Sequence, residues 1–322
     1  MTARSRAVLT RPKNPDGLFY RPGIEQVQRL AELLDIPLVS NKKKHSGINL
    51  ILGCSQGSFL KEIKGQEKPV PSILFAFSHS GFIDRSKDSF SLSKKKPYPS
   101  ASKVICQTQA QKDSILKDLP ELDNVFVEPL IIPRDLKSET SEAEKGMTLK
   151  ALGLSKSKPT YLLIGDYSAK DEIKVALDLA RIMPFAQFIF IGTDPKAKRS
   201  VNKLDERNAL PNLRFLQELR VEFIPSISWD ISGVVVLDNL LCFPFFLQDC
   251  IWSEIPVISV HLDLLQGLLD PEIDYIRVEL SPLSIYNAIK ESKFQEILES
   301  SKKHLEELKK EFDPKAVLKL NP

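Results

Sequence analysis

The sequence predicts an α/β protein of two doubly wound, Rossmann-like domains with parallel sheets, and three observations support this prediction. Short apolar runs rich in β-branched residues alternate with longer stretches of helical periodicity. This alternation occurs twice, before and after a polar segment. The chain has 322 residues, of which 42% are hydrophobic and 27% charged, and this composition supplies enough apolar residues for two separate cores.

The first half of the chain is predicted to contain two helices and a set of short strands. The helices are expected at residues 24–34, where apolar residues recur at helical spacing, and at residues 109–116. The strands are expected at residues 6–10, 36–40, 48–53, 72–77, 103–107 and 125–132.

The second half repeats the pattern, which indicates parallel strands joined by right-handed helical crossovers. Strands are expected at residues 160–164, 187–191, 213–216, 233–237, 256–260 and 275–278. Helices are expected at residues 171–182, 197–208, 243–253, 262–269 and 282–290.

The polar residues 134–149 predict the join between the two domains. We therefore expect a first domain at 1–135, a linker at 136–158, a second domain at 159–292 and a helical tail at 293–322. Leu298, Leu305 and Leu308 give this tail a thin apolar stripe, so it is expected to pack along one face.

Cysteine usage and the absence of targeting signals suggest an intracellular protein. The four cysteines form no CxxC pair and lie in or beside apolar runs, which is typical of buried free thiols in a reducing compartment. No uncharged apolar stretch of about 18 residues is present, and residues 1–12 do not resemble a signal peptide. Neither HExxH nor a Cys/His cluster occurs, so no metal is expected.

The charge is distributed unevenly. Residues 1–140 contain 22 Lys and Arg against 15 Asp and Glu, a net charge of +7, and the remainder contains 23 against 27. The basic runs at 42–44 and 94–96 are either solvated loops or a surface that attracts anionic groups such as phospholipid headgroups. They lack interleaved aromatic residues, so no nucleic acid is expected as a partner.

Common nucleotide and hydrolase motifs are absent. The chain contains no GxGxxG, no P-loop and no GxSxG, which argues against dinucleotide-binding, P-loop and α/β-hydrolase functions. In open α/β sheets ligands bind beyond the carboxyl ends of the strands, where helix N-termini suit phosphates. Two such domains are expected to face each other across a cleft.

The segment LLCFPFFLQD at 240–249, followed by EIPVIS at 254–259, resembles a region of the retaining GT-B glycosyltransferases of family 4. Shorter similarities follow in the order that this family predicts, at residues 22–25, 76–79, 104–108, 152–154, 163–165, 170 and 211–216. The resemblance implies a GT-B fold and transfer of a sugar, with retention, from a nucleoside-diphosphate sugar to an acceptor. It also implies that no cofactor or metal is needed.

The resemblance implies roles for particular residues. His79 and Asp249 correspond to catalytic positions, and Lys13, Asp16 and Gly23 lie on the acceptor side. The expected donor-binding residues are Gly165, Lys170, Asp238, Cys242, Phe243 and Asp249.

For several of these residues a purely structural role is an alternative. His79 and Asp249 are also compatible with hydrogen bonds to the backbone, and Lys170 with solvent exposure beside Asp171. The expected acceptor is a glycan or a lipid, with the protein in the cytoplasm or peripheral at the inner face of the membrane.

The chain departs from the family pattern at two positions. Leu241 stands where the family has the first Glu of its E-x7-E motif, and Asp249 stands at the second. Asp166 occupies the position of an Arg that contacts the diphosphate, and an acidic group there repels the leaving group. An inactive glycosyltransferase-like binding or scaffold protein is therefore the alternative, and a nucleotide-sugar epimerase is a further one.

Overall fold

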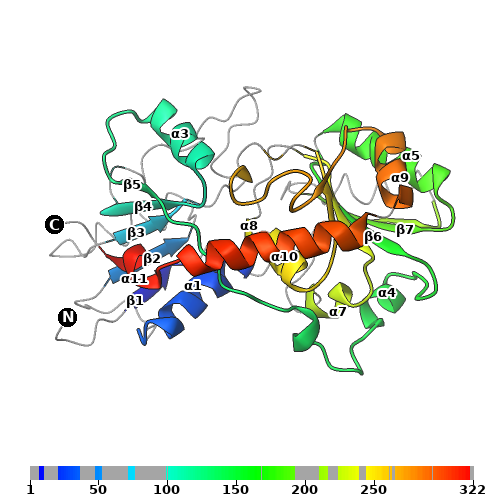
Figure 1. Cartoon of the computed structure of the whole chain (residues 1–322). Helices are drawn as coiled ribbons and strands as arrows, with labels where there is room; N and C mark the ends of the chain where they lie inside the picture. Colours follow the sequence, from blue (N-terminus) through cyan, green and yellow to red (C-terminus); the bar gives the residue numbers. More distant parts are fainter. Residues whose placement is uncertain are drawn as a thin grey trace.

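The computed structural model of the chain contains two parallel sheets with helices around them (Figure 1). The residues that it describes are 7–10, 21–36, 48–52, 72–76, 99, 101–167, 169–192, 210–216, 224–238, 244–260, 262, 265–291 and 293–319.

The first sheet has the described order β1-β2-β3-β4-β5, and every neighbouring pair is parallel. Its strands are β1 (Ala7–Thr10), β2 (Ile48–Leu52), β3 (Ser72–Phe75), β4 (Lys103–Cys106) and β5 (Val125–Val127). Helices α1 (Arg21–Leu33) and α3 (Gln109–Asp118) accompany it. The side chain of Thr108 accepts a hydrogen bond from the Gln111 N–H, which fixes the start of α3 directly after β4.

The second sheet is also parallel throughout and has the order β8-β7-β6-β9-β10-β11. Its strands are β6 (Thr160–Gly165), β7 (Gln187–Gly192), β8 (Leu213–Leu216), β9 (Gly233–Val236), β10 (Val257–Ser259) and β11 (Ile276–Arg277). The helices are α4 (Met147–Ala151), α5 (Lys170–Ile182), α7 (Ile224–Ser228), α8 (Pro244–Trp252) and α9 (Pro282–Glu291).

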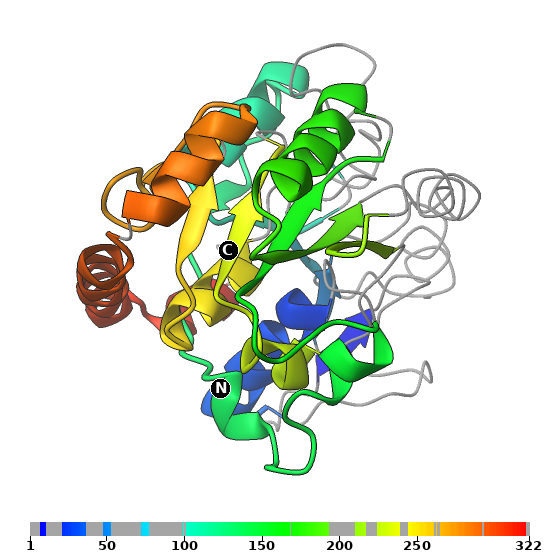
Figure 2. The same cartoon turned by 90° about the vertical axis from the view of Figure 1, so that its right-hand side faces the viewer.

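Helices cover both faces of the second sheet. Figure 2 shows α5 and α9 side by side on one face and α8 on the other. Successive side chains of β6 point to opposite faces of the sheet, as in any β-strand. Leu162 and Ile164 pack toward α8, whereas Tyr161 and Leu163 pack toward α5. This two-sided burial explains why the strands of this sheet appear in the sequence as nearly continuous apolar runs.

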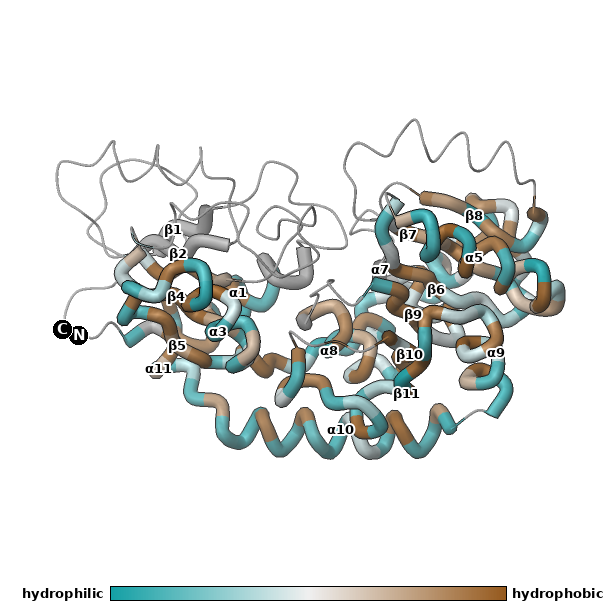
Figure 3. Tube along the Cα trace, turned by 90° about the horizontal axis from the view of Figure 1, so that it is seen from above, coloured by the Kyte–Doolittle hydropathy of each residue, from teal (hydrophilic) through white to brown (hydrophobic). Residues whose placement is uncertain are grey.

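The C-terminal segment connects the two sheets. Helix α10 (Phe294–Glu311) runs along both halves of the molecule and leads to α11 (Pro314–Leu318) beside the first sheet (Figure 1). Along its length α10 alternates between hydrophilic and hydrophobic residues (Figure 3). Leu305 is buried in the core beneath the second sheet, and Val317 is buried in the core of the first sheet. Of the predicted stripe, Leu305 and Leu308 pack in this core, whereas Leu298 is only partly buried.

Two sequence-based expectations differ from the structure. The α-helix predicted at 262–269 is wrong, because among its described residues Leu265 has 3-10 conformation, residues 266–268 form a turn and the Gly267 backbone has φ +84°. The strand predicted at 125–132 ends at Val127 as β5, and Pro129, which has no N–H to donate to a neighbouring strand, follows. The strand predicted at 36–40, apart from Ile36, and the helix predicted at 197–208 lie outside the described residues.

Cys106 and Cys250 are buried free thiols, in agreement with the interpretation of the cysteines. Cys54 and Cys242 lie outside the described residues. In the part of the chain that the structure describes, no helix combines the length and the apolar character that crossing a membrane requires.

Candidate functional site

The strand order of the second sheet reverses between β6 and β9. From β6 the chain proceeds to β7 and β8 on one side, and after β9 it proceeds to β10 and β11 on the other. In open α/β sheets ligands bind outside the carboxyl ends of the strands at such a reversal point. The candidate site therefore lies where β6 ends at Gly165 and β9 ends at Val236.

The end of β6 is held rigidly against the first turn of α5. The Asp166 N–H donates a hydrogen bond of 2.5 Å to Oε2 of Glu172, and both residues are buried. A side chain at position 165 would overlap the Glu172 carboxylate and the Phe190 ring, so only glycine permits this close approach. The loop that follows β6 is thus fixed by packing and by a buried hydrogen bond.

The N-terminus of α5 opens at this edge of the sheet. Lys170 is the first residue of the helix and is exposed. Within the described residues no side chain caps this helix end, where Ala169 is the N-cap. Unpaired N–H groups of a first turn, together with the positive end of the helix dipole, favour an anion. Lys170 adds a formal positive charge, whereas Asp171 and Glu172 of the same turn are acidic, so the groups suited to a phosphate here are the backbone N–H groups and Lys170.

A cavity of about 840 Å³ lies beside this corner, at the carboxyl ends of β9, β10 and β11. Its volume lies within the range of small-molecule sites, roughly 300–1,000 Å³. Carboxylates outnumber cations in its lining, and carboxylate oxygens accept hydrogen bonds from hydroxyl groups. The lining residues are Glu172, Leu237, Val260, Glu272, Arg277, Val278, Glu279, Leu280 and Ser284.

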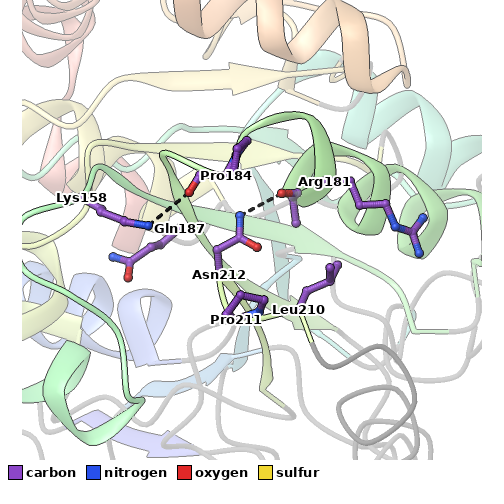
Figure 4. A pocket seen from close by; sticks show the side chains of 8 residues that line it. Lys158, Arg181, Pro184, Gln187, Leu210, Pro211 and Asn212 are labelled. Atoms are coloured by element: carbon purple, nitrogen blue, oxygen red, sulfur yellow. Dashed lines mark hydrogen bonds between the residues drawn. The ribbon is translucent and has the colours of Figure 1, made fainter.

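A smaller cavity, of about 330 Å³, lies at the opposite edge of the sheet, near the amino ends of β7 and β8 (Figure 4). Its polar groups are already engaged within the fold. The side-chain amide of Asn212 donates to the carbonyl oxygens of Ala180, Met183 and Ala186, and Lys158 donates to that of Pro184. The cavity at the carboxyl edge is therefore the stronger candidate for a ligand site.

Asp249 on α8 belongs to a different cluster, at the junction of the two domains. Its side chain is fully buried, and its Oδ2 lies 3.4 Å from Nη1 of Arg134, which follows β5. Arg134 also donates two hydrogen bonds to Glu139, of 2.9 and 2.7 Å, and pairs with Glu25 of α1. One buried arginine thus holds three carboxyl groups from α1, the chain after β5 and α8.

The environment of this cluster shifts the pKa values of its members. Burial raises the pKa of Asp249 to about 8, although the charge of Arg134 acts in the opposite direction. The hydrogen bond from Arg134 lowers the pKa of Glu139. Burial opposes the charge on Arg134, but the hydrogen bond with Glu139 and the charges of Asp249 and Glu25 outweigh it and raise the pKa of Arg134.

The sequence matches no known family model and no curated protein sequence. Solved structures do resemble the chain, at low sequence identity. Sucrose-phosphate synthase from Thermosynechococcus elongatus has a TM-score of 0.63 at 13% identity, over 98% of this chain and 96% of that one. Anabaena Alr3699/HepE in complex with UDP and glucose has a TM-score of 0.64 at 12% identity, over 98% and 97%.

A glycosyltransferase from Rickettsia africae has a TM-score of 0.61 at 12% identity, over 99% of this chain and 100% of that one. These proteins are GT-B glycosyltransferases, and the similarity extends over both sheets. The chain has the GT-B fold. At this level of identity the likeness establishes the architecture, and the GT-B fold expected from the sequence is confirmed.

Within this GT-B fold the described donor residues fall into two groups. Gly165 ends β6, Lys170 and Asp238 follow β6 and β9, and all three lie at the carboxyl edge of the second sheet. Asp249 does not line the cavity and pairs with Arg134 instead, so its contact with a ribose stays a prediction. Of the acceptor residues, Gly23 lies in α1. The expected site residues outside the described part of the chain are His79, Lys13, Asp16, Cys242 and Phe243.

Several residues of this GT-B site were not singled out from the sequence. Glu172, Glu272, Arg277 and Glu279 line the cavity, but they lie in charged stretches that have no distinctive spacing. Arg134 lies in the polar segment assigned to the domain join, where a buried arginine has no sequence signal. Among the described residues, the metal-ligating side chains that come together are Asp270, Asp274 and His304, and none of them lines the cavity.

Proposed function

We propose that this chain is a glycosyltransferase that binds a nucleoside-diphosphate sugar at the carboxyl edge of its second sheet and transfers the sugar to an acceptor. The observation that carries the proposal is the cavity at the reversal point of the sheet, beside the N-terminus of α5. The GT-B neighbours support it, because Alr3699/HepE was crystallised with UDP and with UDP-glucose, and TarM with UDP.

In this proposal, different parts of the donor contact different groups of the protein. The diphosphate would lie at the N-terminus of α5, where the first-turn N–H groups and Lys170 stabilise the charge that develops on the leaving group. Hydroxyl groups of the ribose and sugar would donate to carboxylates such as Glu272 and Glu279. The Asp166 side chain is buried and Lys170 is exposed, so in this proposal the lysine, and not the aspartate, contacts the diphosphate.

The finer assignments rest on the sequence resemblance. We propose that the chain belongs to family 4, that transfer retains the anomeric configuration, and that the donor site works without a metal ion. We also propose a glycan or lipid acceptor on the more basic first domain, and action in the cytoplasm or at the inner face of the membrane.

Calorimetric titration of the purified full chain with UDP, GDP, ADP and their common sugar conjugates tests the donor site. We expect one nucleotide to bind at about micromolar Kd. Lys170→Ala should weaken this binding by about tenfold, because it removes one charge-assisted phosphate contact. Lys174→Ala is the matched control, since Lys174 is an exposed lysine on the same helix, and it should leave the affinity unchanged.

The control variant also separates a local contact from a general charge effect. An equal loss of affinity in both variants would show that the nucleotide responds only to overall charge. Absence of binding by every nucleotide would contradict the proposal. If a nucleotide binds, incubation of the matching nucleotide sugar with candidate acceptors, followed by mass measurement of the products, tests transfer itself.

One observation favours a nucleotide-binding protein without transferase activity as the alternative function. Asp249, which stands at the second acidic position of the family motif, is fully buried against Arg134. A protein of this kind would bind the nucleotide and yield no glycosylated product. Tight binding together with unchanged nucleotide sugar after prolonged incubation would favour this alternative over catalysis.

A further inference from the structure

A cluster of metal-ligating side chains lies between α10 and the turn that leads into β11. Asp270 and Asp274 come from the turn, and His304 comes from the middle of α10. One ligand atom from each residue lies within 4.8 Å of the others. The three residues are distant in sequence, since 30 positions separate Asp274 from His304, and the fold alone brings them together.

The turn places the two aspartates close to each other. Oδ2 of Asp274 accepts a 2.7 Å hydrogen bond from the Asp270 N–H and lies 2.7 Å from Nδ1 of His304. Oδ1 of Asp270 accepts a 2.8 Å hydrogen bond from the Gly267 N–H. Asp274 therefore contacts His304 directly, and the turn holds Asp270 beside this pair.

A second observation at this cluster is compatible with a bound cation. The Asp274 side chain is 0% exposed, yet its Oδ1 has no hydrogen-bond partner. Leaving a buried carboxylate oxygen without a partner is costly, and nearly all such atoms in proteins are satisfied by a donor, by water or by an ion. A divalent cation would satisfy this oxygen and offset the repulsion between the two carboxylates.

We propose that Asp270, Asp274 and His304 bind Zn²⁺. One imidazole nitrogen and two carboxylate oxygens make three of the four ligands of a tetrahedral site, with water as the fourth. Ca²⁺ and Mg²⁺ prefer oxygen ligands alone, so the histidine favours a transition metal. Asp270 and His304 are partly exposed, which leaves the ion a route from solvent.

The ion would be structural. It would tie α10 to the turn that carries Glu272, one of the residues that line the cavity at the carboxyl edge. This role does not depend on the proposed function, and it is compatible with a donor site that works without a metal.

The test uses the purified full chain after exhaustive dialysis against a chelator. Titration with Zn²⁺ should give one site per chain, and the melting temperature should rise with free Zn²⁺ because the ion binds the native state. Asp274→Asn and His304→Gln should each weaken binding by at least about tenfold. Glu299→Gln, a change at an exposed carboxylate on the same helix, should bind Zn²⁺ as the wild type does.

Co²⁺ provides a spectroscopic control for cysteine. A tetrahedral nitrogen and oxygen site gives visible d–d bands without thiolate charge transfer, and these bands should vanish in His304→Gln. If Asp274→Asn fails to fold, Asp270→Asn at the partly exposed ligand replaces it. Absence of stoichiometric binding, or equal binding by the wild type and His304→Gln, would overturn the proposal and leave Asp274 and His304 as an ion pair that docks α10.

Discussion

Nη1 of Arg134 lies 3.4 Å from Oδ2 of Asp249, and this contact joins the chain after β5 to helix α8. The same guanidinium pairs with Glu25 of α1 and with Glu139 of the 3-10 helix η3 (Lys137–Glu139). Arg29 of α1 adds a 3.1 Å contact to Glu139 and a hydrogen bond to the Pro133 carbonyl. The junction of the two domains is therefore a buried charge network centred on Arg134.

Arg134→Ala should destabilise the protein by about 3–5 kcal/mol. The substitution leaves Glu25 and Glu139 without their shared cation and Asp249 without its hydrogen-bond donor, and breaking a buried ion-pair network is costly. Urea unfolding of the two proteins measures the difference. Arg181→Ala removes an exposed arginine that pairs only with Asp178 among the described residues, and it should change stability by less than about 0.5 kcal/mol.

The loss of unfolding free energy caused by Glu139→Gln should become smaller as the pH is lowered. The hydrogen bond from Arg134 lowers the pKa of Glu139, so the stability this carboxylate contributes is present above its ordinary pKa of 4.5 and is lost as the pH falls through the folded value. Urea midpoints of wild type and variant at about pH 7 and about pH 4 give the comparison. A difference that stayed constant with pH would show that the carboxylate charge does not contribute.

Asp249→Asn should show the opposite pH dependence. Burial raises the pKa of Asp249 to about 8 from its ordinary 3.8, so its contribution to stability is full below 3.8 and is lost as the pH rises through about 8. The wild type should therefore lose stability relative to the variant between about pH 5 and about pH 8. Thermal unfolding of both proteins across this range measures the trend, and a rise in the relative stability of the wild type would contradict it.

Leu305→Ala should destabilise the protein by about 2–5 kcal/mol, because Leu305 is 0% exposed and fills the core beneath the second sheet. Leu283→Ala is the matched control on α9, where the leucine is 64% exposed, and it should cost less than about 0.5 kcal/mol. Chemical unfolding measures both. Equal effects would mean that α10 does not pack on the second sheet as described.

Strands were the most predictable part of this fold. Strands β6 and β7 are buried at every residue, so they appear in the sequence as apolar runs whose limits differ by one residue from the prediction. The prediction of a helix at 262–269 was wrong, because burial of apolar residues does not by itself determine the backbone conformation. Its leucines have helical spacing, and the described ones are buried, but Asp270 accepts a hydrogen bond from the Gly267 N–H and closes a turn there instead.

The candidate site was predictable only in part. Gly165 ends a strand at an expected ligand edge and Lys170 follows it, so their position could be inferred from the order of elements. Arg134 could not be found in this way, because its burial depends on α1 and α8, which approach it from distant parts of the chain. His304 and Asp274 likewise meet only after α10 has packed beside β11.

The return of the chain to the first sheet has a consequence for synthesis on the ribosome. Val317 fills the core of the first sheet, and Lys103 donates to the backbone carbonyls of Ala316, Val317 and Lys319. Every residue of the second sheet is translated before these contacts exist. The nascent first domain therefore keeps an apolar surface uncovered until α11 has been synthesised. The two domains then complete their folding together.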